Sequence, residues 1–280
     1  MTHRERLTRR LGTNRVVSSM FTGVVAVFSL LMVVPLVLIL GFITFKGMSH
    51  VDWNLFVSDE RDGGVLNAIV GSAEMVLVAV LLAVPVSVLT GMYLAEARSS
   101  RLAEALRITV DVFQGIPSIV LGIIAYVWLV VPLRSFSGLS GAVALAIMMV
   151  PIIIKSTEES LALVPDAMKE AAYALGAPFH LVMLQVVLPA GLSGVVTGVL
   201  LATARILGET APLLFTSFGG PDLNFNLTRP MEALPPLIFK YAQSPRDDWV
   251  ATAWASSFVL VVVVLLLNLI TKGVVRRWKR

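Results

Sequence analysis

The sequence predicts an all-α integral membrane protein with six transmembrane helices. Of its 280 residues, 57% are hydrophobic and only 14% are charged, whereas soluble domains are about half apolar and a quarter charged. Six long apolar stretches follow one another, and most reach the roughly 20 residues that a helix needs to cross a bilayer core of about 30 Å. Continuous apolar runs of this length exclude the strands of a membrane barrel, in which hydrophobicity alternates.

The six predicted spans begin with a helix that we expect to be retained. The uncharged run after Arg15 is too long for the apolar region of a signal peptide, and no small-residue cleavage motif follows it. Proline at positions 35, 85 and 117 marks places where a span can kink. The predicted spans are Phe21–Phe45, Leu66–Ala95, Ile108–Leu133, Leu139–Ile154, Gly191–Phe215 and Trp249–Thr271.

The basic residues predict that both termini are cytoplasmic. With the N-terminus inside, the cytoplasmic segments hold fifteen Lys and Arg residues and the outer segments hold six, as the positive-inside rule requires. These residues crowd the termini and form no patch interleaved with aromatic side chains, so the net charge of +4 indicates membrane anchoring and no nucleic-acid partner. The chain then divides into an N-terminal arm, first span and first external loop (1–65), a transmembrane domain (66–273) and a basic tail (274–280).

A short helix is predicted in the cytoplasmic segment before the fifth span. Pro165 suits the first helical turn and Asp166 complements the positive helix end. Gly176 is a natural left-handed stop, and Pro178 prevents continuation of the helix. A face of small and apolar residues with charges beside it suits docking into a groove of another protein. That face is formed by Met168, Ala171, Ala172 and Leu175.

The same segment resembles a motif of ATP-driven importers. It is similar to the EAA loop of the permeases of binding-protein-dependent ABC importers. The matching pattern is Glu170-Ala171-Ala172, three residues, Gly176, nine residues, Val186, one residue and Leu188-Pro189. Isoleucine is usual in these permeases at the position of Val186. The resemblance implies the type I importer (MetI-like) permease fold, with the EAA loop at about residues 156–190. It also implies that Glu170, Ala171, Ala172 and Gly176 couple the permease to a cytoplasmic ATPase. An ordinary amphipathic helix at the membrane interface is the alternative, but the basic polar face typical of such helices is weak here.

Further motifs in spans two to five resemble one subgroup of these permeases, the PstA-type subunit of phosphate importers. The four motifs are Gly63–Gly71, Gly115–Val120, Thr157–Glu159 and Ala204–Thr216. Two segments favour the PstA type over the similar PstC type: residues 211–216, which end the fourth motif, and the outer segment Met231–Pro235.

The subgroup implies both a cargo and partners. The cargo would be inorganic phosphate; sulfate, molybdate and phosphonate remain alternatives. One six-span subunit supplies half of a pathway, so two permeases should pack about a pseudo-two-fold axis. The partners implied are a PstC-type permease, two copies of a cytoplasmic ATPase and an extracytoplasmic phosphate-binding protein. ATP and Mg²⁺ would be held by the ATPase, and we expect no cofactor on this chain.

A charged pair is predicted to face the substrate pathway. Arg205, Glu209 and Pro212 continue, through Ala202, the three- and four-residue spacing of Gly194 and Gly198, so we expect all six on one face of the fifth span. The two glycines would let another helix approach closely. A guanidinium stays cationic and matches the paired oxygens of an oxyanion, and Glu209 would neutralise it when the path is empty. The alternative is an ion pair that only fixes helix packing.

Glu74 is a weaker candidate for the pathway. It lies in the second span, where an acid is costly unless it has a function or a partner. It could face the pathway, pair with Arg205 or contact an outer loop.

Missing motifs make an enzyme improbable. The chain has no Gly-Lys dipeptide and therefore no P-loop, and it lacks His-Glu-x-x-His and Gly-x-Ser-x-Gly. It contains no cysteine, and its three histidines are scattered, so no metal site is expected. We therefore predict a transport subunit; a passive anion channel is the alternative from another class.

Overall fold

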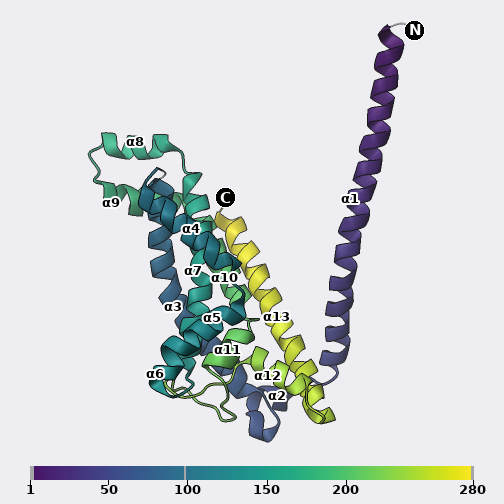
Figure 1. Cartoon of the computed structure of the whole chain (residues 1–280), viewed down its shortest axis with the longest axis vertical. Helices are drawn as coiled ribbons and strands as arrows, with labels where there is room; N and C mark the ends of the chain where they lie inside the picture. The colour runs from purple at the N-terminus through teal and green to yellow at the C-terminus, as the bar shows by residue number, and fades with distance from the viewer. Residues whose placement is uncertain (1–2, 98, 279–280) are drawn as a thin grey trace.

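The computed structural model describes residues 3–97 and 99–278, and every regular element in these ranges is helical. Figure 1 shows a bundle of long helices with α1 standing beside it. Both chain ends and the short helix α8 (Asp166–Ala174) lie at one end of the bundle, called here the α8 end. The short helices α2 (Trp53–Val57) and α12 (Leu234–Ala242) lie at the opposite end, called the α12 end.

Five helical stretches in the described ranges are long and apolar enough to cross a membrane, and a bent helix pair makes up to six crossings. Predicted spans one, two, four and six are confirmed. The fourth is longer than predicted, because its helix continues to Ala162 and includes Thr157–Glu159. The stretches are α1 (His3–Met48), α3 (Leu66–Glu96), α7 (Gly138–Ala162), the run Phe179–Ile206 that ends in α10 (Leu188–Ile206), and α13 (Asp247–Trp278).

The third predicted span is broken at Pro117, the residue that the sequence marks as a possible kink. The chain forms α4 (Arg101–Gly115), turns by 104°, and continues as one run, Ser118–Leu133. Pro117 lacks the N–H that would continue the helix, and a residue before proline avoids the helical region; Ile116 is accordingly extended, with ψ of 128°. The run after the bend consists of α5 (Ser118–Ala125), a π-helical turn (Tyr126–Val130) and α6 (Val131–Leu133).

The fifth span also ends earlier than predicted. Helix α10 stops at Ile206, and a separate helix α11 covers Ala211–Thr216. The last turn tightens, since the Gly208 N–H bonds to the Arg205 carbonyl at 3.2 Å, as is common at helix ends. Pro212 then occupies the first turn of α11, where its missing N–H costs nothing. Residues 205, 209 and 212 therefore do not share one helix face.

Helices α3, α7 and α10 form the core of the bundle, around buried side chains such as Met75, Met149 and Ile206. The predicted close helix approach is confirmed, and its partner is α7. Ser156 Oγ donates to the Gly194 carbonyl at 3.2 Å, and a Cβ placed on Gly194 would overlap the Ser160 side chain. Small residues allow such backbone proximity where lipid supplies no hydrophobic drive.

Helix α1 is almost free of the bundle. None of its most apolar 18-residue window is buried. It meets α13 near the α12 end, where the rings of Phe42 and Trp254 lie edge to face with centroids 5.2 Å apart. Its 46 residues correspond to about 69 Å, so α1 is longer than a bilayer core is thick.

Candidate functional site

Arg205 lies in the last turn of α10 with an open side chain. Its Nε is 3.7 Å from Glu209 Oε1, and the two side chains are 53% and 17% exposed. The structure thus brings the predicted pair together, although Glu209 belongs to the connection after the helix. A cation at a helix C-terminus is favoured by the helix dipole. With about half of its side chain exposed, Arg205 has room for a second anionic partner.

Residues of three other helices, α4, α5 and α7, lie around Arg205. It borders a narrow recess with Gln114 of α4, next to the break in the third crossing, and with Pro151 of α7. Gln114 Nε2 lies 3.4 Å from the Pro151 carbonyl, a long hydrogen bond. The arrangement places one cation and one neutral amide donor beside an interrupted helix. It can attract an anion but offers no nucleophile or proton-transfer pair.

Glu74 is not joined to Arg205. It is half-buried on α3, and within residues 3–97 and 99–278 it takes part in no ion pair with the arginine. Its Oε2 atom is buried without a hydrogen-bond partner. An unsatisfied carboxyl group of this kind is costly in a membrane-spanning helix.

The predicted short helix before the fifth span is confirmed as α8. Pro165 precedes it, and Gly176 has φ of +81°, the left-handed conformation expected of a helix stop. The helix projects sideways at the α8 end of the bundle (Figure 1). Of the predicted coupling residues, Ala172 is half-buried while Glu170, Ala171 and Gly176 are exposed. The name coupling surface is used below for five exposed residues of α8 and its C-terminal end: Met168, Glu170, Ala171, Tyr173 and Leu175.

One charged side chain of α8 points the opposite way. Lys169 is only 8% exposed, and its Nζ lies 2.7 Å from Glu96 Oε2 at the end of α3 and 3.4 Å from Asp166 Oδ1. Burial by itself would lower the pKa of Lys169, but the hydrogen bonds and charges of Glu96 and Asp166 outweigh it and raise the pKa. The sequence suggested no such contact, because Glu96 is 73 residues away.

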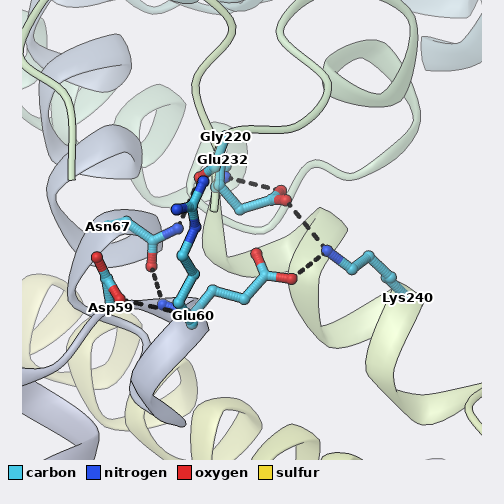
Figure 2. A network of polar contacts seen from close by, with 8 residues as sticks. Asp59, Glu60, Asn67, Gly220, Glu232 and Lys240 are labelled. Atoms are coloured by element: carbon cyan, nitrogen blue, oxygen red, sulfur yellow. Dashed lines mark hydrogen bonds and ion pairs between the residues drawn. The ribbon is translucent and has the colours of Figure 1, made fainter. Parts of the chain in front are cut away.

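A polar network at the α12 end was also not predicted. Lys240 of α12 lies between two carboxylates: it bonds closely to Glu60 and its Nζ is 3.7 Å from Glu232 Oε2 (Figure 2). Asn67 of α3 donates to the Gly220 carbonyl at 2.8 Å and accepts from the Glu60 N–H at 3.2 Å. The network ties the start of α3 to segments more than 150 residues away. A sequence signal was available only in part, as Glu232 lies in the segment Met231–Pro235.

Glu232 should make stability at the α12 end depend on pH. It is 3% exposed, and burial raises its pKa above the ordinary 4.5, although the charge of Lys240 and the Ala233 N–H lower it and Glu60 raises it further. A raised pKa means that the folded state binds more protons than the unfolded state. The contribution of Glu232 to stability is therefore complete below about pH 4.5 and is lost as the pH rises through the folded-state pKa. Glu232→Gln should therefore raise the thermal unfolding midpoint in detergent at pH 7 by about 2–4 °C, as about 1 kcal/mol does in a chain of this size.

Asp248 provides a control of opposite sign. Its exposed carboxylate forms an ion pair with Arg246, whose Nη2 lies 2.5 Å from Asp248 Oδ2, so the charged form contributes to stability. Asp248→Asn should lower the midpoint slightly at pH 7. If Glu232→Gln lowered the midpoint at pH 7, the buried carboxylate would be stabilising and the expected sign would be wrong.

Comparison with known proteins places the chain among transport proteins. Residues 83–280 match the family described as the binding-protein-dependent transport system inner membrane component. The phosphate transport system permease protein PstA of Yersinia pestis is 43% identical over 240 residues, which cover 84% of this chain and 81% of the relative. PstA of Mycobacterium leprae is 33% identical over 271 residues, covering 93% and 88%.

The fold matches a chain of a solved ABC transporter. A chain of the MetNI methionine ABC transporter, in a structure described as inward-facing, superposes with a TM-score of 0.66 at 19% identity, covering 77% of this chain and 96% of that one. At this identity the likeness concerns the fold alone. It confirms the predicted MetI-like architecture.

Proposed function

Since the chain belongs to the binding-protein-dependent transport system inner membrane components, within the PstA group of phosphate transport permeases, we propose that it lines half of an ATP-driven import path for inorganic phosphate. The observation that carries this proposal is the exposed side chain of Arg205, which bears a guanidinium group, at the end of a membrane-crossing helix. Such a group can give two parallel N–H bonds to phosphate oxygens. Glu74, with its unsatisfied oxygen, is a second, weaker candidate for the path.

Glu209 gives a reason for phosphate over sulfate. A carboxylate only accepts hydrogen bonds, so next to Arg205 it favours an anion that brings its own proton. The protonated forms of phosphate have an O–H group to donate, whereas sulfate has none near neutral pH. The selectivity expected from the pair is thus for phosphate, with sulfate, molybdate and phosphonate as alternative cargoes.

The coupling surface of α8 fits docking to a separate ATPase. Its residues are exposed and project from the bundle, and the chain itself carries no P-loop. We assign ATP and Mg²⁺ to the ATPase, in two copies, and the contact to Glu170, Ala171, Ala172 and Gly176. The same helix lying passively at the membrane interface is the alternative.

The exposed side of Arg205 requires a second protein to complete the lining of the path. A PstC-type permease related by a pseudo-two-fold axis would supply it, and an extracytoplasmic phosphate-binding protein would deliver the anion at the α12 end. In this arrangement both termini and α8, which share one end of the bundle (Figure 1), are cytoplasmic, as the basic residues indicate.

The absence of native cysteine allows a direct test of orientation. Leu175 is 90% exposed at the α8 end and Phe225 is 67% exposed in the loop before α12. In intact cells a membrane-impermeant thiol reagent should label Phe225→Cys and should reach Leu175→Cys only after lysis. The reverse pattern would contradict the proposed orientation.

The proposed transport is tested by reconstitution. The complex of this chain with a PstC-type permease, the ATPase and the binding protein should hydrolyse ATP faster with phosphate than with sulfate and should concentrate labelled phosphate in proteoliposomes. Uptake that continues without ATP would indicate a passive channel. Stimulation by sulfate but not by phosphate would contradict the proposed cargo.

A further inference from the structure

Helix α8 contributes few buried side chains to the bundle. Its half-buried Ala172 packs against an apolar cluster that includes Met92 and Ala95 of α3 and Val182 and Met183 of the run Phe179–Ile206, and its buried side chain is Lys169. Most other side chains of the helix are exposed. Besides its chain connections to α7 and to the run Phe179–Ile206 and its packing against that run, α8 reaches α3 through the side chain of Lys169.

The ion pair of Lys169 is the polar part of this attachment. Its Nζ is 2.7 Å from Glu96 Oε2, and the lysine and glutamate side chains are 10% and 33% exposed. A partly buried pair is less screened by salt than a surface pair, and removing one partner leaves the other charge poorly solvated. Asp166, at 3.4 Å, is the second carboxylate near the lysine, but it belongs to α8 itself and its side chain is 63% exposed.

Glu96 is the last residue of a rod that spans the whole bundle. Helix α3 runs for 31 residues from Leu66 to Glu96. At its other end, Asn67 joins the network of Glu60 and Gly220, and Ser72 Oγ accepts a hydrogen bond from Leu234 N–H at 2.9 Å. One helix thus connects the attachment of α8 with the segments of the α12 end.

We infer that the Lys169–Glu96 ion pair is the link through which a displacement of α8 is passed to α3. Both are positioning residues, since neither touches the cargo path. The inference deepens the proposed function and rests on it: an ATPase that moves α8 would pull on the end of α3 through this pair. Without the pair, ATP could still be hydrolysed while α3 lags behind.

The link is tested by the amount of anion moved per ATP hydrolysed. In the reconstituted full complex, Lys169→Gln and Glu96→Gln should each lower this ratio by about 10-fold while ATP hydrolysis persists. Exchange of the two charges, Lys169→Glu with Glu96→Lys, should restore the ratio to within about 3-fold of wild type. Asp111→Asn is the control, because it removes an exposed ion pair with Lys155 at 3.2 Å that does not involve α8.

The outcomes separate a link from a merely structural contact. A structural role would reduce uptake and hydrolysis in proportion and leave the ratio unchanged, which would overturn the inference, as would a charge exchange that restores nothing. If the wild-type complex transports another anion, the ratio is measured with that anion. A missing response to phosphate would then count against the proposed cargo, whereas an unchanged ratio would count against the link.

Discussion

Replacing Arg205 with alanine is expected to lower phosphate uptake by the full complex by about 100-fold or more. Removing a preorganised donor to an anion has a cost of this order. Arg205 is the only Lys or Arg between Lys169 and Arg229, so no nearby cation along the chain can take its place. Because more than half of its side chain is exposed, the substitution removes little packing. Initial rates of labelled phosphate uptake in proteoliposomes, normalised to assembled complex, measure the loss.

Two further variants test whether the effect depends on the bidentate geometry of the guanidinium and on the position of the charge. Arg205→Lys keeps the cation but loses the bidentate geometry, and it should retain part of the uptake. Arg229→Ala removes an exposed arginine of the loop before α12 and should leave uptake unchanged. If Arg205→Ala instead removed the subunit from the membrane or blocked assembly, the ion pair with Glu209 would be a packing contact and not part of the path.

The second large effect is expected on α8. Leu175→Glu places a charge on the coupling surface beside Gly176, and Glu170→Lys reverses one there. Both side chains are exposed in the isolated chain, so its fold should be preserved. The charge would have to be desolvated in the cleft of a partner, and we expect copurification of the ATPase and phosphate uptake to fall by at least about 10-fold. ATPase retained per permease after purification in mild detergent measures the first effect.

A control at the same end of the bundle isolates the role of α8. Leu102 is 60% exposed on α4, and Leu102→Glu introduces the same charge away from the coupling surface. It should keep both the ATPase and the uptake. Normal ATPase binding by Leu175→Glu and Glu170→Lys would favour a passive helix at the membrane interface.

The bounds of α8 and of most spans could be predicted because their signals are local. Proline at 165 and 178 and glycine at 176 define a short helix within a dozen residues, and long apolar runs define membrane crossings. The size of the break in the third crossing and the early end of the fifth were not predicted for one reason: hydropathy does not distinguish a continuous apolar helix from a broken one. Pro117 marks a possible kink, but a proline alone does not predict a turn of 104°, after which α5 packs against α11.

The candidate site was predicted in composition but not in geometry. Arg205 and Glu209 do form a pair, yet across a helix end. The contacts of Lys169 and of Lys240 were not predicted, because they join residues 73 and 180 positions apart. Periodicity along one helix carries no information about such distant partners. Only the folded arrangement, in which Lys169 of α8 reaches the end of α3 and α12 packs near the start of α3, brings these charges together.

The isolation of α1 also bears on how the chain is made. Its contact with the bundle is to α13, through residues such as Phe42 and Trp254, which lie roughly 200 residues apart. At a synthesis rate of about 5–20 residues per second, α1 leaves the ribosome about 10–40 s before its intramolecular neighbour exists. During that interval the insertion machinery, lipid or another subunit must shield a long apolar helix. Helix α1 therefore stays without this intramolecular neighbour until α13 is synthesised.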